Sequence, residues 1–568
     1  MARLYVQEII IHYMKTKNIF FLIIFSLLLF QLPAQEPATC FRIQLKDKNL
    51  SPYSVTRPEE FLSPRAINNK ARYNIPITIE DIPVNPQYKQ QICAINASIR
   101  ILSESKWQNT VVIYCPDSLA LEAVKVLPFT DTTVIPVASY NLTPSQEEKE
   151  IVPNNNNDLL QNDLYFDSLF DYGPAWAQIA FHNGHRLHEL GYYGDDMLIV
   201  VLDGGWEGFN HIPYFQIMYE NGQLLGTRDL IPDHDNIYDG GSHGTKVTSI
   251  MATAADGEYI GAAPHARYYL ILSENPFNEE LIEEDFWAQG IEIADSLGAD
   301  VVNSSLGYST FPEFHQGDFT YESCDGIASI ASRNASLACQ KGIAVCVSAG
   351  NEGNNSWHYI THPADAFDVL CVGAARAIDS AMAYFSSYGP SADGRVKPDV
   401  VSVGWDTFVV NTDGSVYSGN GTSFASPVMA GLTACLRQAL PQKNAIEIMD
   451  IIRQHGHQYN TPDSIMGYGI PDMYQAYLDN ALVQVEPVKV QNKFTVYPNP
   501  CTDRLVIPNP EYTIRKIEVY DVSGKLIYHF DNCGRALIQM PVSQLIDGFY
   551  IVRIHSSNGI ETTKIIKR

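Results

Sequence analysis

Gly421-Thr422-Ser423-Phe424-Ala425-Ser426-Pro427 places a serine between a flexible glycine and a proline, a residue that helices accept mainly in their first turn. The pattern predicts that Ser423 lies at the N-terminus of a helix, where backbone N–H groups and the helix dipole stabilise negative charge. A nucleophile whose reaction passes through an oxyanion benefits from that position. An ordinary junction between a loop and a helix has the same pattern, so catalysis needs support from other segments.

Two upstream segments can supply the general base and the group that holds it, both of which a serine nucleophile needs. The apolar run of residues 197–202 predicts a buried parallel strand. Asp203 follows at the carboxyl end of this strand, where open α/β sheets place their sites. His243 precedes a helix predicted over residues 246–255. Asp203 and His243 can therefore face Ser423 across one crevice.

Asn351 is a candidate donor to the oxyanion. It lies between glycines in the segment 344–353, where a second buried strand runs into it. Its side-chain amide can act beside the backbone N–H of Ser423, and one such donor is worth roughly 10²–10³ in kcat. Taken singly, Asp203, His243 and Asn351 also fit ordinary turn residues. Their joint order of Asp, His and Ser is one of the three known orders of a catalytic triad.

Together these segments resemble the subtilisin-like (subtilase, S8-type) serine endopeptidases over roughly residues 160 to 480. The resemblance rests on the motifs Val201-Leu202-Asp203, His243-Gly244-Thr245, Val302-Asn303-Ser304-Ser305-Leu306-Gly307, Ala349-Gly350-Asn351-Glu352-Gly353, His362-Pro363-Ala364, Phe385-Ser386-Ser387-Tyr388-Gly389-Pro390, Lys397-Pro398-Asp399-Val400 and the serine motif. It implies an α/β fold, a subtilisin-like three-layer domain with a mainly parallel sheet. One departure is Gly204, where the family usually has Ser or Thr.

The resemblance also implies a role for each site residue. The catalytic group comprises the nucleophile, the general base and acid, the residue that orients it, and the oxyanion donor: Ser423, His243, Asp203 and Asn351. By the same resemblance, two backbone segments pair with the extended substrate and form the walls of its specificity pocket: Ser305, Leu306 and Gly307 in one, and Ser348, Ala349 and Gly350 in the other. Thr361 forms the floor of that pocket. An uncharged floor favours uncharged substrate side chains, and cleavage chiefly after Lys or Arg would contradict this hypothesis.

Composition and the N-terminus indicate an exported protein. Lys and Arg number 38 against 64 Asp and Glu, a net charge of −26, which argues against nucleic acid or an anionic membrane as the partner. Residues 1–34 contain a basic segment, an apolar run and then small residues, which predicts a signal peptide, with Met14 as an alternative start. No later segment is long and apolar enough to predict a transmembrane helix.

Further domains are expected on both sides of the catalytic domain, which we place at residues 163–482. Residues 35–140 resemble the inhibitory α+β propeptides of subtilases, with an accessory binding domain as the alternative. The polar, Asn-rich residues 141–162 predict an exposed linker and the maturation cut. A second linker is expected at 483–493. Residues 494–568 predict a small all-β sandwich of five short strands.

The last domain resembles the C-terminal sorting domain of Bacteroidetes type IX secretion. The matching segments are Val496-Tyr497-Pro498-Asn499-Pro500, Val519-Tyr520-Asp521-Val522-Ser523-Gly524-Lys525 and Gly548-Phe549-Tyr550-Ile551-Val552. The resemblance implies export across the outer membrane, to the medium or to the cell surface, with the secretion machinery as a partner. A carbohydrate-binding or adhesive sandwich is the alternative.

Cysteines and acidic loops predict few further sites. Of ten cysteines, Cys346, Cys371 and Cys435 fall in apolar patterns and are expected as buried thiols. A disulfide between Cys501 and Cys533 is favoured, and one between Cys324 and Cys339 less so. The helical spacing of His182, His185 and His188 allows a metal site, but this stretch resembles the helix that precedes the Asp203 strand in subtilases. Asp233, Asp235 and Asp239 could bind calcium but lack the spacing of a recognisable calcium loop, so no metal residue is expected. The chemistry requires no cofactor, and the sequence leaves a structural calcium undecided.

The predicted function is a secreted serine endopeptidase, made as an autoinhibited precursor, that cleaves protein or peptide substrates through an acyl-enzyme. Its partners are those substrates, its own propeptide and the secretion machinery. The alternative is a catalytically silent domain of the same fold that serves as an adhesin or a substrate-binding module. That alternative needs a broken triad, whereas all four polar roles are filled here.

Overall fold

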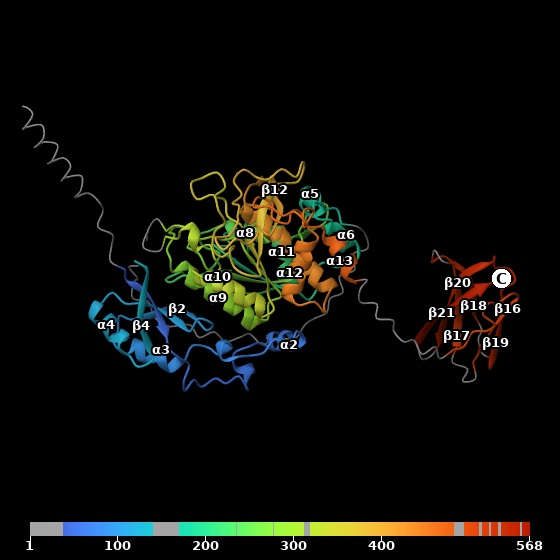
Figure 1. Cartoon of the computed structure of the whole chain (residues 1–568), viewed down its shortest axis with the longest axis horizontal. Helices are drawn as coiled ribbons and strands as arrows, with labels where there is room; N and C mark the ends of the chain where they lie inside the picture. The colour runs from blue at the N-terminus through green and yellow to red at the C-terminus, as the bar shows by residue number, and fades with distance from the viewer. Residues whose placement is uncertain are drawn as a thin grey trace, which may run out of the picture. The chain divides into compact units, whose positions relative to one another are not determined.

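The computed structural model describes residues 38–139, 170–234, 236–275, 278–311, 318–481, 494–509, 514–521, 524–531, 535–556 and 559–568. The chain divides into two compact units, residues 1–481 and 482–568 (Figure 1). The predicted signal peptide and both predicted linkers, at 141–162 and 483–493, lie outside the described residues.

A seven-stranded parallel sheet forms the centre of the first unit, in the order β13-β12-β11-β10-β5-β9-β6. Its strands are β5 (Leu198–Asp203), β6 (Leu224–Asp229), β9 (Arg267–Leu272), β10 (Val301–Ser304), β11 (Ala344–Ser348), β12 (Leu370–Arg376) and β13 (Val400–Trp405). β5 and β10 lie side by side, with β9 and β6 beyond β5 and with β11, β12 and β13 beyond β10. Open α/β sheets place their sites beyond the carboxyl ends of strands at such a switch point.

Helices cover both faces of this sheet. The side chains of Ile199 and Val201 join a core with α8 (His243–Ala252) and α11 (Thr422–Ala439), while Leu198, Val200 and Leu202 join a second core with α9 (Glu283–Leu297) and α10 (Ile330–Gln340). Successive strand residues thus bury opposite faces, as a pleated strand requires. The predicted three-layer α/β architecture is confirmed.

Shorter elements complete this domain. They are the helices α5 (Trp176–Ala180), α6 (Gly184–Glu189), α7 (Pro213–Glu220), α12 (Ala445–Gln454) and α13 (Met473–Ala481), and the pairs β7 (Ala254–Ala255) with β8 (Tyr259–Ile260) and β14 (Thr407–Val410) with β15 (Val416–Gly419). The helix predicted over 246–255 is α8, which begins three residues earlier because His243 already belongs to it.

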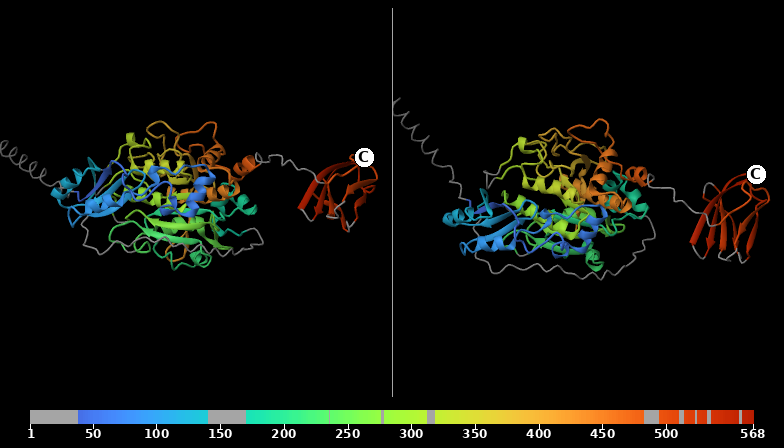
Figure 2. Two further views of the ribbon diagram at one scale, coloured as in Figure 1. Left: turned by 90° about the horizontal axis from the view of Figure 1, so that it is seen from below. Right: turned by 60° about the horizontal axis from the view of Figure 1, so that its bottom comes forward.

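An antiparallel sheet with three helices precedes this domain. Its strands, in the order β2-β3-β1-β4, are β1 (Cys40–Leu45), β2 (Arg100–Ser105), β3 (Thr110–Tyr114) and β4 (Thr130–Ala138). The helices are α2 (Pro64–Arg72), α3 (Pro86–Cys93) and α4 (Ser118–Lys125). Figure 2 shows this N-terminal domain in blue against the side of the molecule that contains α9. The predicted α+β class is confirmed.

The described residues of the second unit form six strands, in two sheets that share one apolar core. β16 (Arg504–Pro508) pairs with β19 (Leu537–Pro541), and the other sheet has the order β18-β17-β20-β21. The remaining strands are β17 (Ile514–Tyr520), β18 (Leu526–Asp531), β20 (Gly548–Ser556) and β21 (Gly559–Lys567). The prediction of five strands omitted β19, a five-residue segment that ends in proline and carries little strand signal.

The expected disulfides are not supported. Cys324 and Cys339 are separate, buried free thiols, so that weaker pairing is wrong. Cys501 is also a free thiol, and Cys533 lies outside the described residues. The three predicted core thiols, Cys346, Cys371 and Cys435, are buried and free, as their apolar contexts indicated.

Candidate active site

Four segments that are distant in sequence meet beyond the carboxyl ends of the central strands. Asp203 is the last residue of β5, and Asn351 follows β11 by three residues. His243 is the first residue of α8, and Ser423 is the second residue of α11. The sheet topology therefore gathers the four predicted polar groups at one edge, as expected at a switch point.

Asp203 and His243 form a direct ion pair. The Nδ1 atom of His243 lies 2.7 Å from Oδ1 of Asp203, whose side chain is fully buried, whereas 39 % of the histidine side chain is exposed. The Gly204 N–H donates to the same carboxylate oxygen at 2.8 Å. The second carboxylate oxygen is buried and has no hydrogen-bond partner within the described residues. Glycine at position 204 supplies no hydroxyl that could reach it.

The ion pair controls the pKa of His243. Burial alone would lower this pKa, but the charge of Asp203 and its hydrogen bond outweigh burial and raise the pKa above 6.5. Glu274, just beyond β9, adds to the increase. Burial and the neighbouring Glu279 and Asp203 raise the pKa of Glu274 itself to about 8. The site thus holds a histidine that titrates higher than usual beside two carboxyl groups.

Ser423 lies in the first turn of α11, and Pro427 lies inside that helix rather than in its first turn. The expectation that proline marks the helix start is therefore wrong. Proline has no N–H, so the carbonyl of Ser423 loses the partner it would normally find four residues later. The hydroxyl of Ser305 donates to that carbonyl at 2.9 Å. The Ser305 side chain thus supplies the hydrogen bond that Pro427 cannot donate to the Ser423 carbonyl.

The hydroxyl of Ser423 donates to the backbone carbonyl of Ser305 at 3.3 Å. No hydrogen bond joins Ser423 to His243 in the part of the chain that the structure describes, and the His243 ring lies parallel to that of Phe424, with centroids 6.2 Å apart. Hydrogen bonds between catalytic groups are often long in substrate-free enzymes and tighten when substrate binds. Rotation of the Ser423 side chain would break its long hydrogen bond to the Ser305 carbonyl and let the hydroxyl donate to His243.

Thr422 orients the amide group of Asn351. The Oδ1 atom of Asn351 accepts hydrogen bonds from the Thr422 N–H at 2.9 Å and from its hydroxyl at 3.0 Å. Because both donors engage the amide oxygen, the amide NH₂ group is left to act as a donor. The sequence did not predict this role of Thr422, although it directly precedes Ser423 in the same motif.

The predicted substrate-binding residues lie after β10, at the end of β11 and in the chain that follows β11. Ser305, Leu306 and Gly307 follow β10, and Ser348, Ala349 and Gly350 end or follow β11. Thr361 lies between them: its N–H donates to the Ala349 carbonyl at 3.1 Å, and its hydroxyl is buried without a partner within the described residues. The structure thus brings every predicted site residue into one region.

Two of the three helically spaced histidines, His182 and His188, are core residues, and His185 is half-buried. The two ring nitrogens of His182 contact the Pro471 carbonyl and the Ser402 hydroxyl, and those of His188 contact Tyr172 and the Ala262 carbonyl. Burial lowers the pKa of both His182 and His188 to about 4, so each is neutral and satisfied. Within the described residues, no group of three or more His, Cys, Asp or Glu side chains could hold a metal ion. Asp235 lies outside those residues.

Comparison with protein families gives three matches. Residues 194–469 match the subtilase family, residues 40–153 a peptidase S8 propeptide domain of Bacteroidota, and residues 495–568 a secretion system C-terminal sorting domain. The C-terminal match indicates export, to the cell surface or to the medium. No helix in the described ranges has the length and apolar character needed to cross a membrane. The exact domain boundaries stay predictions.

Curated relatives agree with these matches at low identity. The chain is 26 % identical over 288 residues to the serine protease AprX of Bacillus subtilis (strain 168), which covers 46 % of this chain and 61 % of that protein. It is 25 % identical over 389 residues to a thermophilic serine proteinase of Bacillus sp. (strain AK1), covering 65 % and 87 %. A solved protease from Pseudoalteromonas arctica PAMC 21717 covers 55 % of this chain and 100 % of its own, with a TM-score of 0.42 and 20 % identity.

Proposed function

We propose that this chain is a serine endopeptidase of the subtilase family, whose model matches residues 194–469, and that it hydrolyses peptide bonds through an acyl-enzyme on Ser423. The observation that carries this proposal is the Asp203–His243 ion pair beside the N-terminus of the helix that holds Ser423. An oriented Asn351 amide supplies the fourth group. The proposed chemistry uses no cofactor.

The reaction follows from the roles of these side chains. His243 accepts the proton of the Ser423 hydroxyl as that oxygen attacks the scissile carbonyl, and Asp203 stabilises the imidazolium that forms. The Asn351 amide donates to the oxyanion of the tetrahedral intermediate. His243 then gives the proton to the leaving amine, which departs and leaves the acyl-enzyme. Water, deprotonated by His243, hydrolyses the ester and restores the serine.

A fluorophosphonate probe tests whether Ser423 is an activated nucleophile. The processed protein should become labelled, and mass spectrometry should place the label on the peptide that contains Ser423. A folded, processed protein that takes up no label would favour the silent binding module. A label on another serine would contradict the assignment of Ser423.

Replacing Asn351 by alanine is expected to lower kcat by roughly 10²–10³ with little effect on folding, because one donor to the oxyanion is lost. Asn355, an exposed residue of the same loop, provides the matched control. Asn355→Ala should leave kcat nearly unchanged. Steady-state kinetics on both variants decide the matter, and an unchanged kcat in Asn351→Ala removes Asn351 from the oxyanion site.

The N-terminal domain acts in this proposal as an inhibitor that leaves after a cut within residues 141–162. It binds α9 through buried charges. Asp295 accepts hydrogen bonds from Lys70 at 2.6 Å and from Lys106 at 3.1 Å. Arg42 makes a bidentate contact with Asp285 at 2.6 and 2.7 Å. The last described residues of the domain also approach the start of α9, where the Ile282 N–H donates to the Val137 carbonyl at 3.0 Å.

Asp295→Asn should speed the release of the N-terminal domain after processing. The substitution leaves Lys70 and Lys106 without their charged partner, and breaking a buried ion pair costs about 3–5 kcal/mol. Affinity for the domain should fall by about two decades or more, which shortens the lag before activity appears. Glu60→Gln, which disrupts the exposed Arg57–Glu60 pair, should not change the lag. Equal lags in wild type and Asp295→Asn would contradict the proposed role of this contact.

The C-terminal domain in this proposal engages the type IX secretion machinery. Its strands form a separate unit with their own core. Fusion of residues 484–568 to a reporter should direct the reporter outside the cell. Retention of the fusion in the periplasm would count against sorting.

A further inference from the structure

Thr361 fills the space between the two walls of the proposed substrate pocket. A Cβ added to Gly307 would lie 2.2 Å from the Thr361 hydroxyl oxygen. A Cβ added to Gly350 would lie 3.0 Å from both the hydroxyl oxygen and the methyl carbon of Thr361. Only 2 % of Thr361 is exposed. The threonine side chain is therefore wedged against one glycine from each wall.

We propose that Thr361, held in place by the buried His362–Asp365 ion pair, makes the pocket shallow, so that the enzyme cleaves after small side chains. This inference rests on the proposed function, because it concerns the pocket that receives the side chain before the scissile bond (P1). Glycines in both walls leave room for a side chain, and Thr361 takes up the depth that a large P1 residue needs. Glycine, alanine and serine are the P1 residues that fit above such a floor.

The backbone around Thr361 is hydrogen-bonded to both walls. Its own N–H donates to the Ala349 carbonyl of one wall at 3.1 Å. The neighbouring His362 exchanges two backbone hydrogen bonds with Tyr308, which directly follows the other wall, at 3.0 and 2.8 Å. Withdrawal of the floor to admit a large side chain would break these bonds in the protein interior, where unmade hydrogen bonds are costly.

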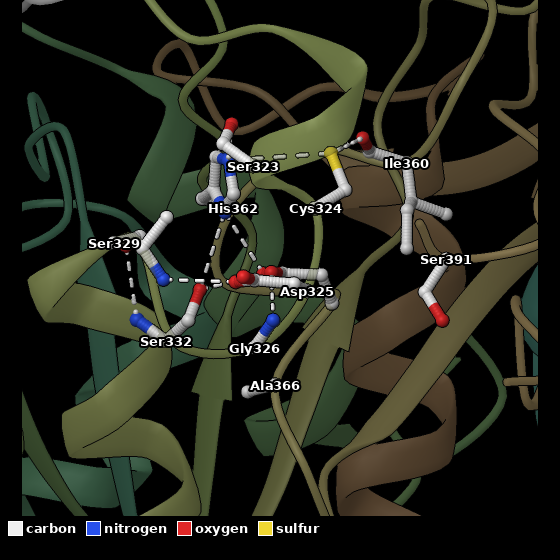
Figure 3. A network of polar contacts seen from close by, with 12 residues as sticks. Ser323, Cys324, Asp325, Gly326, Ser329, Ser332, Ile360, His362, Ala366 and Ser391 are labelled. Carbon is white, nitrogen blue, oxygen red and sulfur yellow. Dashed lines mark hydrogen bonds and ion pairs between the residues drawn. The ribbon is translucent and has the colours of Figure 1, made fainter. Parts of the chain in front are cut away.

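The side chain of His362, the residue after Thr361, lies within a network of polar contacts (Figure 3). Its Nδ1 lies 3.0 Å from Asp365, and its Nε2 lies 3.2 Å from the Ser323 hydroxyl. Asp365 also accepts hydrogen bonds from the Ser332 hydroxyl at 2.5 Å and from the Gly326 N–H at 2.7 Å. Both His362 and Asp365 are fully buried. A displaced His362 would leave an unpaired charge in the interior.

This network is a positioning device and not a second catalytic triad. The Ser323 hydroxyl donates its proton to the Thr320 carbonyl at 2.6 Å, so it accepts a hydrogen bond from the imidazole. Both nitrogens of His362 then donate, which describes an imidazolium and not a general base. Burial would lower the pKa of His362, but Asp365 outweighs it and raises the pKa to about 10. The nearby Cys324 thiol donates to the Ile360 carbonyl at 3.6 Å.

Two peptides that differ only at P1, alanine or phenylalanine, test the inference with processed enzyme. In wild type, kcat/KM for alanine should exceed that for phenylalanine by about 100-fold, since a few methylene groups in a tight pocket have such effects. Thr361→Gly should reduce this ratio at least tenfold, chiefly through faster cleavage after phenylalanine. Thr361→Val keeps the volume without the hydroxyl and should retain the wild-type ratio. Equal cleavage after both residues in wild type, or an unchanged ratio in Thr361→Gly, would overturn the inference.

His362→Gln tests the positioning role, because it removes the charge that pairs with Asp365. The alanine-to-phenylalanine ratio should fall, and the double variant with Asp365→Asn should restore it through a neutral hydrogen-bonded pair. This ratio does not depend on the fraction of folded enzyme, so a variant that is only destabilised keeps the wild-type ratio. An unchanged ratio in His362→Gln would therefore refute the positioning role of His362. Fluorophosphonate labelling separates the two proposals. A wild type that is not labelled refutes the serine protease itself, whereas a labelled enzyme that cleaves equally after both residues refutes only the small pocket.

Discussion

Ser423→Ala is expected to lower kcat by about six decades, the loss seen when a nucleophile that works as a unit with its base is removed. The remaining groups can still polarise a bound peptide, but no oxygen is placed to form the acyl-enzyme. The variant precursor should also remain uncut if maturation is the enzyme's own reaction. Kinetics on variant enzyme whose linker has been cut by an added protease measure the first effect. Gel analysis of the precursor measures the second.

A matched control for this variant is Ser418→Ala, an exposed serine of β15. It should process, take up the fluorophosphonate label and turn over as wild type does. Fluorophosphonate labelling of Ser423→Ala should be absent while its thermal unfolding stays close to that of wild type. A Ser423→Ala enzyme that keeps one per cent or more of the wild-type kcat would show that another group is the nucleophile.

Asp203→Asn should lower kcat by about four decades while the fold persists, because the substitution is nearly isosteric. The Asp203 carboxylate accepts a hydrogen bond from Nδ1 of His243 at 2.7 Å. An asparagine amide can instead donate to Nδ1, which stabilises the tautomer whose other nitrogen carries the proton and cannot accept one from Ser423. Loss of the carboxylate also leaves the imidazolium without its counter-charge.

The same variant makes a prediction for the pH profile. The acid limb of kcat/KM reports the pKa of His243 in the free enzyme, because only the neutral imidazole acts as a base. Asp203 raises this pKa above 6.5 against the opposing effect of burial. Without the carboxylate, burial dominates and the acid limb of the residual activity should move to lower pH. Gln216→Glu, at an exposed position of α7, serves as a charge-changing control. An acid limb in Asp203→Asn at or above that of wild type would contradict the ion pair's effect on His243.

Much of the fold follows from local patterns in the chain. The apolar runs before Asp203 and before Asn351 are the strands β5 and β11. Their branched residues are buried on both faces, and this is the pattern of a strand within a parallel sheet. β19 was missed because its sequence, Leu537 to Pro541, contains a single β-branched residue, whereas β16 of the same length contains two. Pairing with β16 supplies the order that local propensity lacks.

The start of α11 shows the limit of local rules at the site. Proline normally marks the beginning of a helix, and Pro427 lies five residues after the first residue of this one. The exception depends on the Ser305 hydroxyl, which reaches the Ser423 carbonyl from a residue 118 positions earlier. A pattern within seven residues cannot contain that partner.

The sequence by itself determined which side chains carry the proposed chemistry and which elements hold them. Their identity and order suffice for this, because apolar runs that end in Asp203 or lead to Asn351 specify strands and the residues that follow them. Only the tertiary structure decided how these groups are oriented. The Thr422 donors that turn the Asn351 amide, and the packing of Thr361 against Gly307, join segments far apart in the chain. Such contacts depend on packing at distances below 4 Å, which no residue pattern along one segment encodes.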